Sequence, residues 1–501
     1  MSKIFDINAL RLELDKLRDN KKIVLCHGVF DLLHIGHIRY LKRAKELGDV
    51  LVVTITPDKY VNKGPHRPAF SEDLRAEALA SLECVDYVAI NKWPTAVETI
   101  YLLKPHIYAK GAEYKNLYDD PTGGIIKEKN AIEAIGGEIK FIEDITFSSS
   151  SLINKYFSSL SPQAKRFIEQ LKNKYSIDEI LECIDKVKKL RVLILGETII
   201  DEYCFCETMG KSGKEPILAA RYLYEEKFAG GVLAIANHVS SFCDNVFLIS
   251  FLGKDCSQEE FIKSKLKSNI KTHFLFHSGP TIVKRRFVER YPFQKLFEVY
   301  FMKELENEEG SEDLLKCIKE NFDRDLILVA DYGHGMMSES VRKYLCESNR
   351  FLAVNTQINA GNLGFNTISK YERADVVCIS EKELRMEMRS RNKPLEELVK
   401  LLSEKFVYKN IIITRGEKGC VGFSKESGFV YSPALTTRFK DRIGAGDAVF
   451  SIVSLLLAVG VPLDITLFLG NCVGGYAVNI VCNKEFIDRA SIIKYATSFL
   501  K

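Results

Sequence analysis

Two histidines three residues apart stand where a strand is expected to turn into a helix. They belong to the stretch Gly28-Val-Phe-Asp-Leu-Leu-His34-Ile-Gly36-His37, which directly follows a short β-rich run at residues 22–26. This position is the carboxyl end of a parallel strand, where nucleotides bind. The free N–H groups of a helix start attract phosphate, the two imidazoles add donors, and Gly36 lets the backbone approach a ligand. The pattern predicts attack by a substrate phosphate on the α-phosphate of a nucleoside triphosphate, without a protein nucleophile.

A second phosphate-binding pattern lies near the end of the chain. Gly444, Ala445 and Gly446 precede Asp447, and an apolar helix is expected over residues 449–459. Backbone N–H groups in such a turn can form an anion hole for a transferring phosphoryl group. The Asp447 carboxylate can accept the proton of an attacking sugar hydroxyl. The alternative is a tight helix-entry turn without a ligand. The chain contains no Walker A motif, which excludes a P-loop kinase.

These residues need a sheet to position them, and strand-like and helix-like segments do alternate along the first 155 residues. Strands are expected at residues 22–26, 49–55, 86–90, 107–109 and 138–141, and helices at 36–47, 71–82, 95–103 and 127–135. The continuous apolar run at 49–55 is typical of a strand covered on both faces. Such alternation indicates a parallel α/β sheet.

The rest of the chain contains a second α/β block. A serine-rich patch beginning at Ser148 is followed by amphipathic stretches at 164–174 and 177–189, interpreted as a helical connector over 156–189. Assignment of these helices to the first domain is the alternative. Strands are then expected at 191–195, 246–250, 326–330, 352–355, 376–379 and 410–414. We therefore divide the chain into residues 1–155, 156–189 and 190–501.

Composition excludes several classes of protein. The 501 residues are 46% hydrophobic and 28% charged, which is typical of a globular chain, and Lys+Arg minus Asp+Glu is 71 − 67 = +4. This balance argues against nucleic acid as a partner. No apolar run approaches the roughly 20 residues that span a bilayer, so we expect no membrane insertion. The N-terminus carries acids and does not resemble a signal peptide. Thirteen scattered cysteines are typical of reduced thiols in the cytoplasm.

The stretch from Gly28 to His37 resembles the H-x-G-H nucleotidylyltransferases. The motifs that follow resemble the adenylyltransferase domain of the bifunctional heptose kinase/adenylyltransferases over residues 20–155. The resemblance implies catalytic roles for His34 and His37. It also implies that these residues bind the nucleotide: Gly28, Phe30, His34, Gly36, His37, Lys63, Arg67, Lys110, Ser148, Ser149 and Ser150. Class I aminoacyl-tRNA synthetases share H-x-G-H, but no basic tRNA-binding extension is evident here.

Residues 190–501 resemble the ribokinase/PfkB carbohydrate kinases. The resemblance implies a ribokinase-like α/β domain beside an N-terminal Rossmann-like sheet, with Asp447 as the catalytic base. It implies that Asp201, Gly230, Gly231 and Asp447 contact the sugar. It further implies nucleotide binding by Thr414, Gly416, Gly444, Ala445, Gly446 and Glu383, with Glu383 linked to a metal. The chain departs from the family at Asn355-Thr-Gln357, where Asp-Pro-Lys is usual, and at Ser380, where Asn is usual.

Together the two resemblances imply a two-step enzyme of carbohydrate metabolism. The second domain would phosphorylate a sugar resembling a heptose phosphate with ATP. The first would transfer a nucleotidyl group, AMP favoured, to the sugar 1-phosphate and release pyrophosphate, with Mg²⁺ serving both steps. The alternative is a CTP-dependent cytidylyltransferase for a polyol or sugar phosphate, whose degenerate kinase domain acts as scaffold or sensor. Both kinds of relative form oligomers, so a homo-oligomer remains an option.

Overall fold

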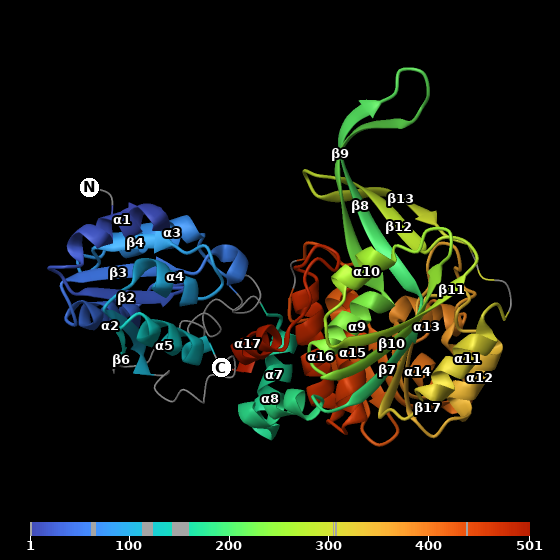
Figure 1. Ribbon diagram of the computed structural model, residues 1–501. Coiled ribbons are helices and arrows are strands. Elements are labelled where there is room, and N and C mark those ends of the chain that lie inside the picture. The colour runs from blue at the N-terminus through green and yellow to red at the C-terminus, as the bar shows by residue number, and fades with distance from the viewer. Residues whose placement is uncertain are drawn as a thin grey trace. The chain divides into compact units, whose positions relative to one another are not determined.

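The chain folds into two compact units, each with its own parallel sheet. The computed structural model describes residues 3–61, 67–112, 124–142, 160–303, 305, 308–436 and 439–500 (Figure 1). The first unit comprises Met1–Ser159 with Ile493–Lys501, and the second comprises Leu160–Ile492. Lys63, Ser148, Ser149 and Ser150 lie outside the described residues.

The sheet of the first unit has six strands, all paired in parallel. Their order is β1 (Ile4–Phe5), β4 (Tyr87–Ile90), β3 (Val50–Ile55), β2 (Ile23–Gly28), β5 (Ile107–Gly111) and β6 (Glu138–Ile142). The chain runs outward from β2 through β3 to β4 and then returns to the other side of β2 as β5. The topological switch point therefore lies between β2 and β5, where a nucleotide is expected to bind.

Two hydrophobic cores cover the two faces of this sheet. Helices α2 (Ile35–Lys45) and α3 (Glu72–Ala80) pack on the face of Val24, Leu51 and Val53. Helices α1 (Ile7–Leu17), α4 (Val97–Leu103) and α5 (Gly124–Ala134) pack on the opposite face. The four inner strands β4, β3, β2 and β5 therefore bury residues of both parities, as expected for a parallel sheet between two helical layers. A short 3₁₀ helix, η1 (Asp58–Tyr60), follows β3.

The second unit is built on a nine-stranded sheet. Its order is β11 (Ile270–His277), β10 (Asn245–Gly253), β7 (Arg191–Gly196), β14 (Leu326–Asp331), β15 (Phe351–Thr356), β16 (Arg373–Ser380), β17 (Val407–Thr414), β18 (Cys420–Ser424) and β19 (Gly428–Ser432). The first seven strands are parallel, and β18 and β19 add an antiparallel edge.

Helices again cover both faces of this sheet (Figure 1). One face carries α9 (Val232–Ser240), α15 (Ala445–Ala458) and α16 (Leu463–Ala477). The other carries α11 (Ser311–Glu320), α12 (Glu339–Glu347), α13 (Glu381–Glu387) and α14 (Leu395–Lys405), whose apolar residues join the sheet in one core. The remaining elements are α7 (Pro162–Lys174), α8 (Ile177–Lys186), α10 (Glu259–Lys265), η3 (Ile368–Lys370), η4 (Gly416–Lys418) and α17 (Arg489–Leu500).

A separate four-stranded sheet, called the small sheet below, stands at one end of the second unit. Its order is β13 (Gln294–Phe301), β12 (Ile282–Glu289), β8 (Thr198–Lys211) and β9 (Leu218–Gly231). Strands β8 and β9 continue outward as a long hairpin (Figure 1). Burial alternates along β12, so that Ile282, Lys284, Arg286 and Val288 form the inner row. The small sheet was not expected from the sequence.

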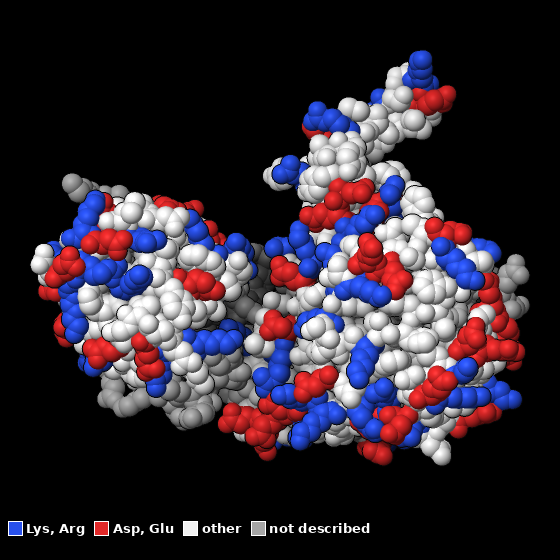
Figure 2. Space-filling view, in the orientation of Figure 1, with Lys and Arg blue, Asp and Glu red and all other residues white. Residues whose placement is uncertain are grey.

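Helices α7 and α8 belong to the second unit, which begins at Leu160. Lys174 of α7 forms an ion pair with Asp464, and Asp185 of α8 forms one with Arg489. The interdomain limits at 155 and 189 stay a prediction. Within the described ranges, no helix combines the length and apolar character that crossing a bilayer requires. On the face seen in Figure 2, charges of both signs are interspersed over each unit.

Candidate active sites

Helix α2 begins with the two predicted histidines, directly after the loop that leaves β2. His34 is the N-cap, and its Nδ1 accepts a hydrogen bond from the Gly36 N–H at 3.1 Å. The His34 and His37 rings stack with centroids 4.0 Å apart, and Phe30 contacts His37 edge-on at 5.3 Å. Because Nδ1 of His34 is an acceptor, its proton lies on Nε2, which can donate to a phosphate oxygen. Burial lowers the pKa of His34, which favours this neutral form.

Asp31 and Arg67 connect the loop after β2 to the segment that precedes α3. Their side chains form a buried ion pair with an N–O separation of 3.6 Å. The Asp31 carboxylate also accepts hydrogen bonds from the backbone N–H groups of Ala69 (2.8 Å) and Phe70 (3.1 Å). Burial lowers the pKa of Arg67, against the opposing effect of the Asp31 charge. The predicted phosphate ligand Arg67 is therefore held beside the loop that leads to His34.

Arg75 has a supporting role that its sequence position did not reveal. Its buried guanidinium donates to the carbonyl oxygens of Val29 (2.6 Å) and Thr56 (3.0 Å) and pairs with Asp58. These contacts join the chain segments that leave β2 and β3. Arg75 therefore fixes the shape of the predicted nucleotide-binding edge.

Lys110, at the end of β5, lies in a buried charge cluster. Its ammonium is 2.9 Å from Glu128 Oε2 on α5, and the Tyr108 hydroxyl donates to the same oxygen at 3.0 Å. Burial acts to raise the pKa of Glu128, but the charge and hydrogen bond of Lys110, together with His27 and the Tyr108 hydroxyl, lower it overall. A phosphate group would compete with Glu128 for this ammonium. Binding of nucleotide by Lys110 stays a prediction.

The second candidate site lies at the start of α15. Gly444 is the N-cap with φ = +82°, and a β-carbon there would come within 2.3 Å of Asn483 Oδ1. Gly446 has open space where a side chain would stand. The Asp447 carboxylate is buried and accepts hydrogen bonds from the Tyr332 hydroxyl (3.2 Å) and from Gln357. Burial raises the pKa of Asp447 to about 7, despite these hydrogen bonds, which poises it as a proton acceptor near neutral pH.

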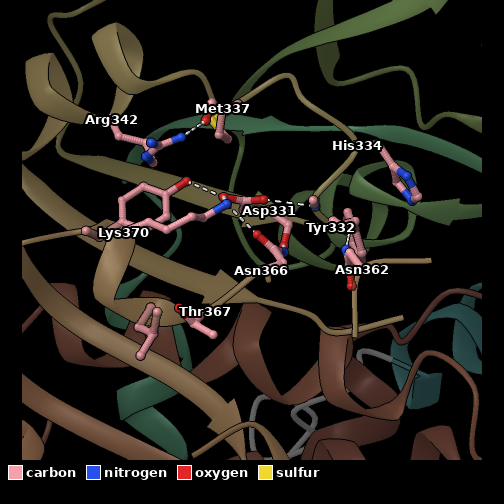
Figure 3. Close-up of polar contacts among 12 residues, drawn as sticks. Asp331, Tyr332, His334, Met337, Arg342, Asn362, Asn366, Thr367 and Lys370 are labelled. Carbon is pink, nitrogen blue, oxygen red and sulfur yellow. Dashed lines mark hydrogen bonds and ion pairs between the residues drawn. The ribbon is translucent and has the colours of Figure 1, made fainter. Parts of the chain in front are cut away.

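A polar network around Asp331 supports the two segments that carry Tyr332 and Gln357, and Figure 3 shows its members Asp331, Asn366 and Lys370. Asn366 Nδ2 donates to the carbonyl oxygens of Asp331 (2.9 Å) and Gln357 (3.0 Å). Asp331 in turn accepts from Tyr371 (2.8 Å) and pairs with Lys370 (3.0 Å). This network ties the end of β14 to the loop that carries Gln357, and therefore positions the base.

Glu197 anchors the adjoining loop after β14. Its carboxylate accepts the backbone N–H groups of Tyr332 (2.9 Å) and His334 (3.1 Å). Burial and the charge of Asp331 raise the pKa of Glu197 to about 7. In Figure 3 the His334 ring points away from the Asp331 cluster. No role for Glu197 was expected from the sequence, and Gln357 stood out only as a departure from the family pattern, so their contacts alone reveal what they do.

Three of the four predicted sugar-binding residues, Asp201, Gly230 and Gly231, come together on the small sheet. Asp201 on β8 is buried and pairs with Arg286 of β12. A β-carbon on Gly230 would stand 2.0 Å from Asp201 Oδ2, so only glycine fits opposite this carboxylate. Gly231 has φ = +53° and is the N-cap of α9. The negative charge of Asp201 also acts on the pKa of Asp447, which indicates that both carboxylates belong to one region.

Glu383 is engaged in capping α13. One carboxylate oxygen accepts the Ser380 N–H at 2.7 Å in a capping box, and the other accepts the Ile358 N–H at 3.0 Å. Among the described residues, no group of three or more His, Cys, Asp or Glu is arranged to hold a metal ion. The metal role of Glu383 stays a prediction.

Thr414 ends β17, and Gly416 follows with φ = +57° and open space around it. Between them, Arg415 pairs with Glu381 of α13 at 2.8 Å. The segment therefore starts at the carboxyl end of a parallel strand, as expected for a nucleotide site. Its contact with ATP stays a prediction.

Two family models match the chain. One, described as pfkB family carbohydrate kinase, matches residues 189–479, which is more than half of the chain. The other, described as cytidylyltransferase-like, matches residues 25–155. The chain also resembles the bifunctional protein HldE of Pelobacter propionicus, with 41% identity over 150 residues, and that of Helicobacter pylori strain P12, with 50% identity over 110 residues. These matches cover 30% and 21% of this chain, and 29% and 24% of the relatives.

The chain thus spans less than a third of the length of these curated relatives. Among solved structures, phosphofructokinase-2 from Escherichia coli in complex with potassium matches with a TM-score of 0.51 and 13% identity, over 62% of this chain and 100% of that chain. At this identity the likeness concerns the fold alone. The predicted α/β classes and the order of the two domains are confirmed. The chain belongs to the pfkB family of carbohydrate kinases, with a nucleotidylyltransferase-like region fused ahead of the kinase region.

Proposed function

We propose that this chain synthesises a nucleotide sugar in two steps. The second unit phosphorylates a sugar resembling a heptose phosphate at its anomeric hydroxyl with ATP. The first unit then transfers a nucleotidyl group, with AMP favoured, to the sugar 1-phosphate and releases pyrophosphate. The proposal depends on one observation: the chain has two different helix N-termini of the kind that bind phosphate. One begins α2 with the histidine pair, and the other begins α15 with the Gly444–Asp447 turn.

The kinase step follows from the surroundings of Asp447. Its carboxylate accepts the proton of the sugar hydroxyl while the hydroxyl oxygen attacks the γ-phosphorus of ATP, and ADP leaves. The backbone N–H groups around Gly444–Gly446 stabilise the charge on the transferred phosphoryl group. Tyr332 and Gln357 orient the carboxylate. Asp201, whose carboxylate lies against Gly230, would bind a sugar hydroxyl.

The transferase step follows from the start of α2. A sugar 1-phosphate oxygen attacks the α-phosphorus of the nucleotide, and the bond to pyrophosphate breaks. His34 Nε2–H, the His37 ring and the helix N-terminus stabilise the charge that grows on the phosphoryl oxygens. Arg67 lies close to this loop and would assist with its positive charge. Magnesium would be bound by the nucleotide phosphates and neutralise part of their charge.

The direct test is product analysis with the full chain. The protein is incubated with Mg²⁺, ATP and a panel of heptose and hexose phosphates, and products are identified by mass spectrometry. The proposal expects an ADP-sugar and pyrophosphate. Absence of pyrophosphate release with every sugar phosphate and sugar 1-phosphate would overturn it.

A CTP-dependent transferase with a degenerate kinase is the second candidate. Its support is the replacement of Asp-Pro-Lys by Asn355-Thr-Gln357, where Gln357 donates a hydrogen bond to the proposed base. Calorimetry with ATP and CTP separates the nucleotides, since tighter binding of CTP at the H-x-G-H site would favour this candidate. Undetectable sugar phosphorylation in the unmodified chain would support the degenerate kinase.

A further inference from the structure

The small sheet contacts the segment that leads into α15 at one buried carboxylate, that of Asp441. This side chain has an exposed fraction of 0%. Its Oδ2 accepts a hydrogen bond from the Tyr203 hydroxyl of β8 at 2.6 Å, and its Oδ1 pairs with the Lys295 ammonium of β13. Two strands of the small sheet therefore meet at a carboxylate that lies just ahead of the Gly444–Asp447 turn.

The same carboxylate holds both sides of the turn. Its Oδ1 also accepts the backbone N–H of Ile443 at 3.1 Å, and Ile443 directly precedes the N-cap Gly444. Its Oδ2 accepts the N–H of Cys482 at 3.0 Å. Cys482 precedes Asn483, whose Oδ1 would stand 2.3 Å from a β-carbon on Gly444. A displacement of this carboxylate would therefore move the turn and also the segment packed against it.

The Lys295 ammonium is the counterion of this carboxylate. One hydrophobic cluster joins the small sheet to the turn, and its members are Tyr203, Phe205, Phe228, Val288 and Cys482, with Ile443 and Val481 packed against them. A buried carboxylate in such surroundings is costly unless it is paired. Burial acts to raise the pKa of Asp441, but the hydrogen bonds and charge of its partners, Lys295 first among them, lower it overall. Among the described residues, only Lys295 forms an ion pair with Asp441.

The contact also extends to the sugar side of the proposed kinase site. Asp201 and Tyr203 of β8 lie opposite Lys284 and Arg286, which both belong to the inner row of β12. The Arg286 guanidinium pairs with Asp201 and lies 6.0 Å from the centre of the Tyr203 ring. The Lys295 ammonium lies 5.5 Å from the centre of the same ring. A continuous series of contacts therefore connects the proposed sugar ligand with the turn.

We propose that Lys295 is a positioning residue for sugar phosphorylation: by fixing the Asp441 carboxylate, it aligns the small sheet, which holds the sugar, with the turn that holds the transferred phosphoryl group. This inference rests on the proposed kinase function and adds to it a residue that acts through Asp441. The attacking hydroxyl and the γ-phosphorus are held on the two sides of this contact. A misalignment of about 1 Å between reacting groups can lower a rate about 100-fold.

The test compares matched lysine variants of the full chain. Lys295→Met removes the charge and keeps much of the length of the side chain. Lys227→Met is the control, because the exposed fraction of this β9 side chain is 33% against 32% for Lys295, and it also pairs with a buried carboxylate, that of Glu202. Glu202 alternates with Asp201 along β8 and faces the other side of the sheet. We expect kcat for ADP release to fall about 10- to 100-fold in Lys295→Met, with KM nearly unchanged, and to stay unchanged in the control.

Three further measurements connect the effect to Asp441. Lys295→Arg should keep most of kcat, because a guanidinium also pairs with a carboxylate, and added ethylammonium should partly restore kcat of Lys295→Ala. In an Asp441→Asn background, Lys295→Met should change kcat little, because the two residues act as one pair. Hydrogen exchange of the backbone amides in residues 441–446 and 480–484 should accelerate in Lys295→Met and not in the control.

Three outcomes would overturn the inference. An unchanged kcat with a lower melting temperature would make Lys295 a stabilising residue only. A rise in KM alone would mean that its ammonium contacts a substrate. An equal loss of kcat in the Asp441→Asn background would show that it does not act through this carboxylate. If Lys295→Met does not fold, Lys295→Gln gives the same comparison.

Failure of the proposed kinase function is a separate result. If the unmodified chain phosphorylates no sugar, that function fails, and hydrogen exchange alone then decides whether Lys295 fixes the turn. Unchanged exchange in Lys295→Met would overturn the connection between the small sheet and the turn, and accelerated exchange would support it.

Discussion

At the scale of single residues, Asp447 carries the kinase proposal. Asp447→Asn keeps the size of the side chain but removes the proton acceptor, so we expect kcat for sugar phosphorylation to fall about 10²- to 10⁴-fold. Sugar affinity should change little, because Asp201 and Gly230 are untouched. ADP release measures the rate. Asp313→Asn, an exposed carboxylate in the first turn of α11, is the control, and similar rates for the two variants would contradict the assignment.

The raised pKa of Asp447 also predicts pH dependence in two directions. A base with a pKa of about 7 is protonated in acid, so kcat/KM should fall as pH decreases below about 7. The free energy of unfolding changes with pH in the opposite direction to kcat/KM. The folded chain holds the proton more tightly than the unfolded chain, whose Asp has its ordinary pKa near 3.8. Stability is therefore lost as pH rises from about 4 to about 7.

Asp447→Asn should remove this loss of stability. Its melting temperature should exceed that of the unmodified chain at pH 8, and the two should converge near pH 4. Differential scanning calorimetry at the two pH values measures the difference. A variant that is less stable at pH 8 would show that the hydrogen bonds from Tyr332 and Gln357 outweigh the effect of burial.

At the scale of elements, the two glycines of the turn into α15 have different roles: Gly444 is needed for folding and Gly446 for ATP binding. Gly444 adopts φ = +82° against Asn483, so Gly444→Ala should destabilise the second unit by about 1–3 kcal/mol and abolish phosphorylation. Gly446→Ala meets open space and should fold normally, while weakening ATP binding through the added methyl group. Thermal melts and ATP titrations distinguish the two variants. Equal melting temperatures of the Gly444→Ala and Gly446→Ala variants would contradict the role given to Gly444.

Apolar runs and turn residues predict the sheets well at this scale. Residues 49–55, expected as a strand buried on both faces, form β3, and all six strands expected in the second unit are present. The small sheet was missed because β12 reads Ile-Val-Lys-Arg-Arg-Phe-Val-Glu, with charges on both strand parities. A run with this charge pattern is typical of a solvent-exposed segment. Arg286 can be buried here because it forms ion pairs with Asp201 and Glu298, which the sequence of the strand does not reveal. Helix α1 and the two-residue strand β1 were also missed.

The candidate sites were only partly predictable from the sequence. His34, Gly36 and Asp447 are close in sequence to the helix starts that place them, so their positions follow from local rules. Gln357 and Lys295 come from distant segments and acquire a role only through tertiary contacts. Glu383 caps α13, a role that the sequence analysis did not give it, and its predicted link to a metal stays a prediction.

At the scale of the whole molecule, we expect that a variant which loses the activity of one unit keeps the activity of the other. His34→Ala and His37→Ala remove donors at α2, so nucleotide transfer from a supplied sugar 1-phosphate should fall about 10²- to 10³-fold. Phosphorylation by the same variants should be unchanged, because each unit has its own core. Asp447→Asn should show the converse. His273→Ala, an exposed histidine on β11, is the control.

Independence has a further consequence that an ordinary activity assay would miss. Mixing His37→Ala with Asp447→Asn supplies one intact kinase site and one intact transferase site on different chains. If sugar 1-phosphate diffuses freely between sites, the mixture should form nucleotide sugar from ATP and the starting sugar phosphate, after a lag that shortens as protein concentration rises. Pulse-labelling with ¹⁴C-sugar and separation of the products would measure this lag. Failure to complement, with each single activity intact, would mean that the intermediate passes only between the two sites of one chain.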